Sequence, residues 1–151
     1  MSDTQTTLTL ETTQGPIVIR MRPDLAPSHV AHISRLVGEK FYDGIVFHRV
    51  IDGFMAQTGC PNATGTGGSK YPDLKAEFND APHVRGTCSM ARAASPDSAN
   101  SQFFICFAPQ PSLNRKYTVW GEVTAGMANV DKIKRGEPVR EPDRIIKATV
   151  S

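Results

Sequence analysis

The segment 47–59 carries the residues whose types could do chemistry, because it combines two polar side chains with several apolar ones. Arg49 supplies a guanidinium, and Gln57 supplies a primary amide. Apolar surface comes from Phe54 and Met55. Arginine stays charged at any workable pH and donates hydrogen bonds without giving up a proton. The segment therefore predicts a cationic donor beside an apolar patch, with no proton transfer required.

The turn at Asp52-Gly53 predicts a β-hairpin, and the loop length decides which side chains share a face. A two-residue loop would place Arg49 opposite Ala56. A three-residue loop, in which the glycine takes a positive φ, would place Arg49 opposite Gln57. The second register gathers the guanidinium and the amide on one surface.

The rest of the chain reads as short strands separated by turn signals, with two helical stretches. Alternation and turn residues of this kind favour a closed or nearly closed antiparallel β-barrel. Segment 59–80, rich in Gly, Pro, Asn, Thr and Ser, is expected to be a long ordered loop. Beyond the two hairpin strands, we expect strands over 8–12, 17–21, 87–90, 102–107, 117–123 and 144–150, and helices over 27–38 and 126–134.

Length and composition predict one globular domain spanning residues 1–151. The chain has 151 residues, 39% of them hydrophobic and 21% charged, which suits a single packed core rather than disorder. Its formal net charge of +2 is too small, and its basic residues too scattered, to indicate nucleic-acid binding.

Cysteine usage and hydropathy predict a cytoplasmic protein. The three cysteines, Cys60, Cys88 and Cys106, are too few and odd in number for a disulfide framework, which suits a reducing compartment. The first fourteen residues lack the basic and apolar regions of a secretory signal, and no apolar run approaches membrane-spanning length.

Four ordered motifs make the chain resemble one family. The run F-H-R-V-I-D-G-F-M-A-Q-T-G is similar to the signature of the cyclophilin peptidyl-prolyl cis-trans isomerases. Segments 65–78, 98–105 and 116–123 continue the resemblance in the expected order, over nearly the whole chain. The compact length resembles the short bacterial cytoplasmic members. The resemblance implies a mainly β fold, a closed antiparallel eight-stranded β-barrel capped by two α-helices.

The same resemblance implies an activity, its partners and its site residues. We expect an isomerase that acts on proline-containing peptides and on unfolded or folding proteins, as a monomer, with no metal and no organic cofactor. Arg49 matches the catalytic position. The substrate-binding positions of the family match Phe54, Met55, Gln57, Ala91, Arg92, Gln102, Phe104, Leu113 and Tyr117.

Three departures from the family pattern modify these expectations. Ser112 stands where members commonly carry a tryptophan, so cyclosporin is expected to bind weakly, with isomerisation unaffected. Tyr117 replaces a common histidine and can still pack and donate from its hydroxyl. Arg92 replaces a common asparagine and is expected to favour acidic residues ahead of proline.

Two functions of other classes remain open. The chain could be a proline-peptide binding module or holdase chaperone without turnover, although retention of Arg49 beside the pocket argues against this. It could be a nucleic-acid-binding barrel, but aromatic residues interleaved with a basic face are missing.

Several single residues have a structural interpretation that is favoured over a functional one. His29 and His32 lie three residues apart on the predicted helix, but no cysteine or carboxylate joins them at a spacing that suits a metal. His48 is expected to be an interior histidine with its hydrogen bonds satisfied. Cys60 has no neighbour in sequence that would activate its thiol.

Overall fold

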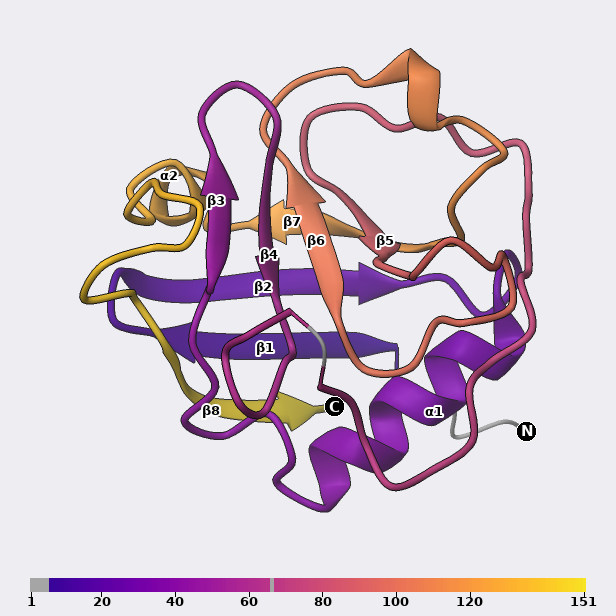
Figure 1. The fold of residues 1–151 in the computed structure, drawn as a ribbon, viewed down its shortest axis with the longest axis horizontal. Helices are drawn as coiled ribbons and strands as arrows, with labels where there is room; N and C mark the ends of the chain where they lie inside the picture. Colours follow the sequence, from indigo (N-terminus) through magenta and orange to yellow (C-terminus); the bar gives the residue numbers. More distant parts are fainter. Residues whose placement is uncertain (1–5, 66) are drawn as a thin grey trace.

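The computed structural model describes residues 6–65 and 67–151; residues 1–5 of the predicted domain and residue 66 of the second motif lie outside the described residues. Eight antiparallel strands form a single curled sheet (Figure 1). No helix in the described ranges is both long and apolar enough to cross a membrane. The elements are β1 Thr7–Thr12, β2 Gly15–Met21, α1 Pro27–Gly38, β3 Arg49–Ile51, β4 Met55–Thr58, β5 Thr87–Met90, β6 Phe103–Cys106, η1 Pro111–Leu113, β7 Val119–Ala125, α2 Met127–Val130 and β8 Ile145–Val150.

The hairpin formed by β3 and β4 adopts the register of the three-residue loop. Arg49 lies opposite Gln57, and Ile51 lies opposite Met55. Gly53 has a φ of 72°, a conformation that costs a glycine little because it has no Cβ. Of the two registers that the sequence allows, the structure therefore has the one in which the guanidinium and the amide share one face.

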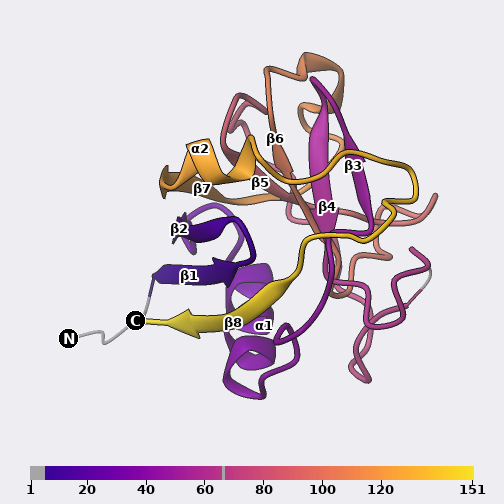
Figure 2. The same ribbon diagram turned by 90° about the vertical axis from the view of Figure 1, so that its left-hand side faces the viewer.

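The sheet is an open half-barrel, so the closed barrel that we expected is not confirmed. The strand order is β3-β4-β6-β5-β7-β2-β1-β8, which leaves β3 and β8 as the two edges (Figure 2). In the described part of the chain, this gap is crossed by two isolated bridges, Val46 to Arg144 and Val50 to Gly136, and by single backbone hydrogen bonds such as the one from the Ile145 N–H to the Ile45 carbonyl at 2.8 Å, but β3 and β8 themselves are not paired. The reason is local: β3 has three residues, and Pro138 and Pro142 interrupt the segment before β8, where a proline cannot donate to a ladder.

The two predicted helices are present, but the second is shorter than expected. α1 starts on Pro27 and buries Val30, Ile33 and Val37, the apolar stripe expected of an amphipathic helix. α2 stops at Val130, because the N–H groups of Lys132 and Ile133 bond three residues back rather than four, as in tighter turns. Ile133 still packs into the core from this turn.

Strand β6 separates two apolar clusters because its side chains alternate between faces. Phe103 and Ile105 belong to the main core, as predicted. Within that core the ring of Phe103 packs edge-on against Trp120, with centroids 5.2 Å apart. Phe104 and Cys106 belong instead to a smaller cluster on the opposite face. One strand thus supports both the fold and a second apolar surface.

The histidines of the chain are all buried, and His48 differs from expectation. Its side chain is interior, but neither ring nitrogen has a hydrogen-bond partner among the described residues, so the expectation of a satisfied histidine is wrong. Burial lowers the pKa of His29, His32, His48 and His83.

This burial predicts a protein that loses stability on mild acidification. In the unfolded chain a histidine takes up a proton near pH 6.5, whereas the native pKa is lower, so the unfolded state binds more protons below that pH. The stability is fully present above about pH 6.5 and falls as the pH drops, by up to about 1.4 kcal/mol per pH unit for each histidine that stays neutral. Thermal unfolding between pH 7 and pH 5 measures this, and His48→Leu should flatten the slope. A melting temperature that is constant or rising across that range contradicts the prediction.

Candidate active site

Two adjoining hollows lie beside strand β4 and the loops that follow β4 and β5. The smaller one is a pocket of about 130 Å³, and the larger one is a polar cavity of about 740 Å³. Gln57, Ala91 and Arg92 line both and form the wall between them. A single ring could enter the small pocket while the neighbouring chain extends across the larger hollow.

The structure brings nearly all of the predicted site residues to the small pocket. Its lining consists of Arg49, Phe54, Met55, Gln57, Ala91, Arg92, Phe104, Leu113 and Tyr117. Gln102, the remaining predicted residue, lines the larger cavity and contacts Gln57. These residues come from four separate stretches of the chain, 49–57, 91–92, 102–104 and 113–117.

Strand register explains how these side chains meet. On β4, Met55 and Gln57 point to the same face, because successive side chains alternate. Gln57 pairs with Phe104 on the neighbouring strand β6, and Met55 pairs with Cys106. Met55 and Phe104 are buried at 2% and 5% exposure, so the pocket floor is dry.

Arg49 lies at the rim of this pocket and is held by two acceptors. Its Nη1 donates to the Gln57 Oε1 at 3.4 Å, and its Nε donates to the Glu137 Oε2 at 2.6 Å. Gln57 in turn donates to the Gln102 Oε1 at 2.8 Å. The guanidinium therefore ends a chain of side-chain hydrogen bonds and remains partly exposed, at 39%.

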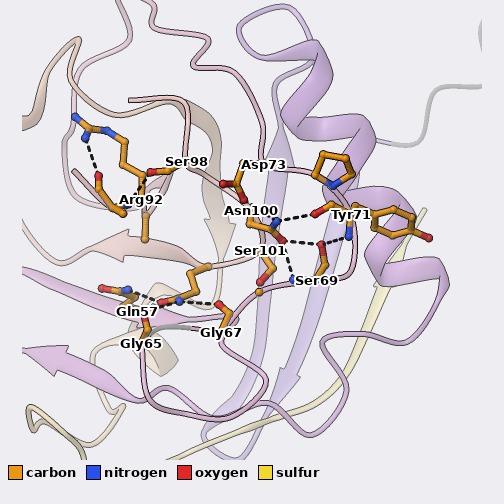
Figure 3. Close-up of a pocket in the computed structure, with 15 residues that line it drawn as sticks. Gln57, Gly65, Gly67, Ser69, Tyr71, Asp73, Arg92, Ser98, Asn100 and Ser101 are labelled. Carbon is orange, nitrogen blue, oxygen red and sulfur yellow. Dashed lines mark hydrogen bonds between the residues drawn. The ribbon is translucent and has the colours of Figure 1, made fainter. Parts of the chain in front are cut away.

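Gly65 and Gly67 anchor the far end of this chain, on one side of the polar cavity (Figure 3). The side-chain amide of Gln102 donates to the carbonyl oxygens of Gly65 and Gly67, each at 3.0 Å. Across the cavity, Asn100 accepts from the Ser69 N–H at 2.7 Å and donates to Asp73 at 3.0 Å. Loop backbone and amide side chains thus form a hydrogen-bonding surface next to the apolar pocket.

Arg92 is held on the wall by backbone carbonyls rather than by a carboxylate. Its Nε and Nη2 donate to the Lys116 carbonyl oxygen at 3.0 and 2.7 Å, and Nη1 donates to the Ala93 carbonyl at 3.0 Å. The guanidinium carbon lies 4.5 Å from the ring centroid of Tyr117, a cation–π arrangement. The charge is therefore fixed, and no described carboxylate forms a salt bridge with it.

Sequence reasoning missed Glu137 and the residues across the polar cavity. Glu137 is 88 positions from Arg49, and nothing in its local spacing links the two. The only carboxylate near Arg49 in the sequence is that of Asp52, and it pairs with Arg135 instead, at 3.1 Å. Such a pairing follows from the path of segment 136–144 beside β3, which a sequence pattern does not encode.

The thiol and histidine candidates have neighbours that the sequence did not reveal. Burial acts to raise the pKa of the Cys60 thiol, but backbone N–H groups outweigh it and lower that pKa; those of Gly65 and Gly67 lie 3.3 Å from Sγ. The sequence did not reveal these donors, but the thiol is buried, and the structural interpretation of Cys60 stays a prediction. His29 contacts the Glu77 carboxylate at 2.6 Å, but the described part of the chain has no group of three metal-ligating side chains.

Comparison with known proteins places this chain in a family. The family model for "Cyclophilin type peptidyl-prolyl cis-trans isomerase/CLD" matches residues 7–150. A probable peptidyl-prolyl cis-trans isomerase of Brucella suis is 52% identical over 99% of this chain and 84% of its own. The peptidyl-prolyl cis-trans isomerase B of Bacillus subtilis is 45% identical over 83% of this chain and 87% of its own.

Solved structures agree with this result at the level of the fold. The cyclophilin AquaCyp293 from Hirschia baltica has a TM-score of 0.89 and 29% identity, over 96% of this chain and 73% of its own. A Cryptosporidium parvum cyclophilin, crystallised with the dipeptide Ala-Pro, has a TM-score of 0.89 and 24% identity, over 96% of this chain and 98% of its own. The same family is indicated by the half-barrel sheet, by the motif that carries Arg49 and by these similarities. The chain belongs to the cyclophilin-type peptidyl-prolyl cis-trans isomerases.

Proposed function

We propose that the chain accelerates rotation about X-Pro bonds by hydrogen-bond donation from Arg49 to the prolyl nitrogen. The observation that carries the proposal is the position of this guanidinium, at the rim of a small, dry apolar pocket. The proline ring would occupy the pocket, against Phe54, Met55 and Phe104. The prolyl nitrogen would then face the rim.

The chemistry of the bond explains why one donor suffices. Amide resonance creates a barrier of about 18–20 kcal/mol, and uncatalysed exchange takes roughly tens to hundreds of seconds. At the twisted midpoint the nitrogen lone pair is no longer shared with the carbonyl, so it can accept a hydrogen bond. A donor aimed at that nitrogen binds the transition state better than the planar ground state, which lowers the barrier. A fixed charge next to a water-excluded pocket makes this contact stronger.

The remaining site residues suit an extended peptide. Gln57 and Gln102 present side-chain amides along the wall, while Ala91 and Arg92 lie between the two hollows. Leu113 and Tyr117 complete the apolar side of the pocket. The partners are therefore proline-containing peptides and unfolded or folding proteins.

The broader organisation follows from the same observations. We infer that residues 1–151 act as one domain and as a monomer. The free state of all three cysteines supports a reducing compartment such as the cytoplasm.

A proline-peptide binding module or holdase is the alternative function. Such a protein would need the apolar pocket but no oriented cation at its rim. The hydrogen bonds that hold the Arg49 guanidinium support turnover over simple binding. Measured turnover distinguishes the two.

Replacement Arg49→Ala should reduce kcat/KM by about 10²–10³, the usual effect of removing one transition-state donor. A protease-coupled or NMR exchange assay on a proline peptide measures the loss. Arg20→Ala is the matched control, because it removes an exposed arginine from β2, away from the site. Unchanged turnover in a folded Arg49→Ala protein would rule out the mechanism.

Arg92 should favour an acidic residue before proline. The hydrogen-bond donors of Arg92 are occupied by carbonyl oxygens, so any preference comes from the positive charge at this partly exposed position. At low salt we expect turnover of a Glu-Pro peptide to be about two- to fivefold faster than turnover of a Lys-Pro peptide. Arg92→Lys should keep most of the preference and Arg92→Ala should lose it. Equal turnover of both peptides by the unmodified protein at low salt contradicts this prediction.

Cyclosporin should bind weakly because Ser112 lacks the indole donor of a tryptophan. Ser112 lies exposed in η1, next to Leu113 of the pocket. Replacement Ser112→Trp should tighten binding by about tenfold, the order expected for one buried aromatic contact with a hydrogen bond. Inhibition curves for both proteins measure it, and tight inhibition of the unmodified protein would show that the prediction is wrong.

A further inference from the structure

We propose that Glu137 is a positioning residue for isomerisation, which fixes the direction of the Arg49 guanidinium. The inference rests on the proposed role of Arg49 as donor. Glu137 does not line the apolar pocket and is separated from Arg49 by 88 positions in the chain. Its action on the reaction is therefore through the arginine and not through contact with substrate.

The geometry divides the five donor hydrogens of the guanidinium between structure and substrate. Glu137 accepts from Nε at 2.6 Å, and Gln57 accepts from Nη1 at 3.4 Å. The short bond from Nε pins the part of the guanidinium nearest the side-chain stem. The donors of Nη2 have no hydrogen-bond partner among the described residues and stay available at the pocket rim.

The backbone holds Glu137 in place beside β3. Val50 and Gly136 exchange two backbone hydrogen bonds, each 2.8 Å long, and the Val139 N–H donates to the His48 carbonyl at 3.1 Å. Segment 136–139 therefore runs along the open edge of the half-barrel, next to the strand that carries Arg49. A Cβ on Gly136 would lie 2.8 Å from the Pro138 carbonyl oxygen, so the turn admits only glycine without rearrangement.

The charges around this pair make Glu137 the carboxylate that matters for Arg49. Asp52, the acidic residue nearest in sequence, is engaged by Arg135 at 3.1 Å. In the described part of the chain, the only salt bridge of Arg49 is the one with Glu137. Arg135 also donates to the carbonyl oxygens of Asp131 and Ile133, which keeps this neighbouring cation directed away from the site.

Exposure indicates that the pair acts on orientation and contributes little to stability. The side chains of Arg49 and Glu137 are 39% and 57% exposed, and ion pairs of that kind stabilise folds little. A free arginine side chain samples many rotamers, and freezing it at the transition state costs conformational entropy. A carboxylate that orders the guanidinium beforehand removes part of that cost, so the effect should appear in kcat.

The test compares two changes in the same loop. Glu137→Ala should lower kcat about five- to tenfold, because part of the conformational entropy of the arginine side chain must then be lost at the transition state. KM should change by less than about twofold. The kcat of Glu137→Gln should lie between those of the unmodified protein and Glu137→Ala, because the amide oxygen still accepts a hydrogen bond but carries no charge. Glu141→Ala is the matched control: it removes the same charge from the same loop without removing an acceptor of Arg49. Melting temperatures should stay within about 2 °C for Glu137→Gln.

A double-mutant cycle separates this inference from the proposed function. In an Arg49→Ala background, Glu137→Ala should cause no further loss, because a positioning residue has nothing left to position. The Arg49 Nε–H resonance should also lose its protection from solvent exchange in the Glu137→Ala protein. Unchanged or increased kcat in Glu137→Ala, while Arg49→Ala shows its expected loss of activity, overturns the positioning role alone. Full activity of Arg49→Ala overturns the proposed mechanism instead.

Discussion

The site depends on one physical constraint: the Arg49 side chain must carry a charge and must also hold a fixed orientation. A long, flexible side chain at the protein surface satisfies the first requirement easily and the second only with help. Here the help comes from acceptors on both sides of the Arg49 guanidinium, Gln57 on the pocket wall and Glu137 at the sheet edge. The dry floor beside it, made by Met55 and Phe104, keeps the charge effective.

The curled sheet supplies these requirements through strand alternation. The face of β6 that carries Phe103 and Ile105 joins the main core, and the other face carries Phe104 into the pocket cluster. One strand therefore contributes both to the stability of the core and to the recognition pocket. The gap between the edge strands β3 and β8 also contributes to the site. The segment that runs along this gap forms a turn that contains Gly136 and Glu137.

Much of the fold and part of the candidate site could be predicted from sequence. The Asp52-Gly53 turn and the alternation around it predicted the hairpin, which the structure confirms, and allowed two registers, of which the structure has the one with a three-residue loop. Strand β5 falls on the expected residues, and α1 spans the expected range. We expected a closed barrel and a longer α2 than the structure has. The periodicity of apolar residues indicates which face of an element is buried, but it does not indicate where backbone hydrogen bonding stops.

The sequence by itself determined which residues can do chemistry and which local elements carry them. Arg49, its hairpin and its apolar neighbours are adjacent in the chain, so short-range rules of turns and alternation are sufficient. Only the tertiary structure decided what surrounds them: Gln102 joins Gln57, Glu137 reaches the guanidinium, and loop amides point at Cys60. These contacts join segments far apart in the chain, and long-range pairing depends on the packing of the whole sheet, which no local pattern of residues specifies.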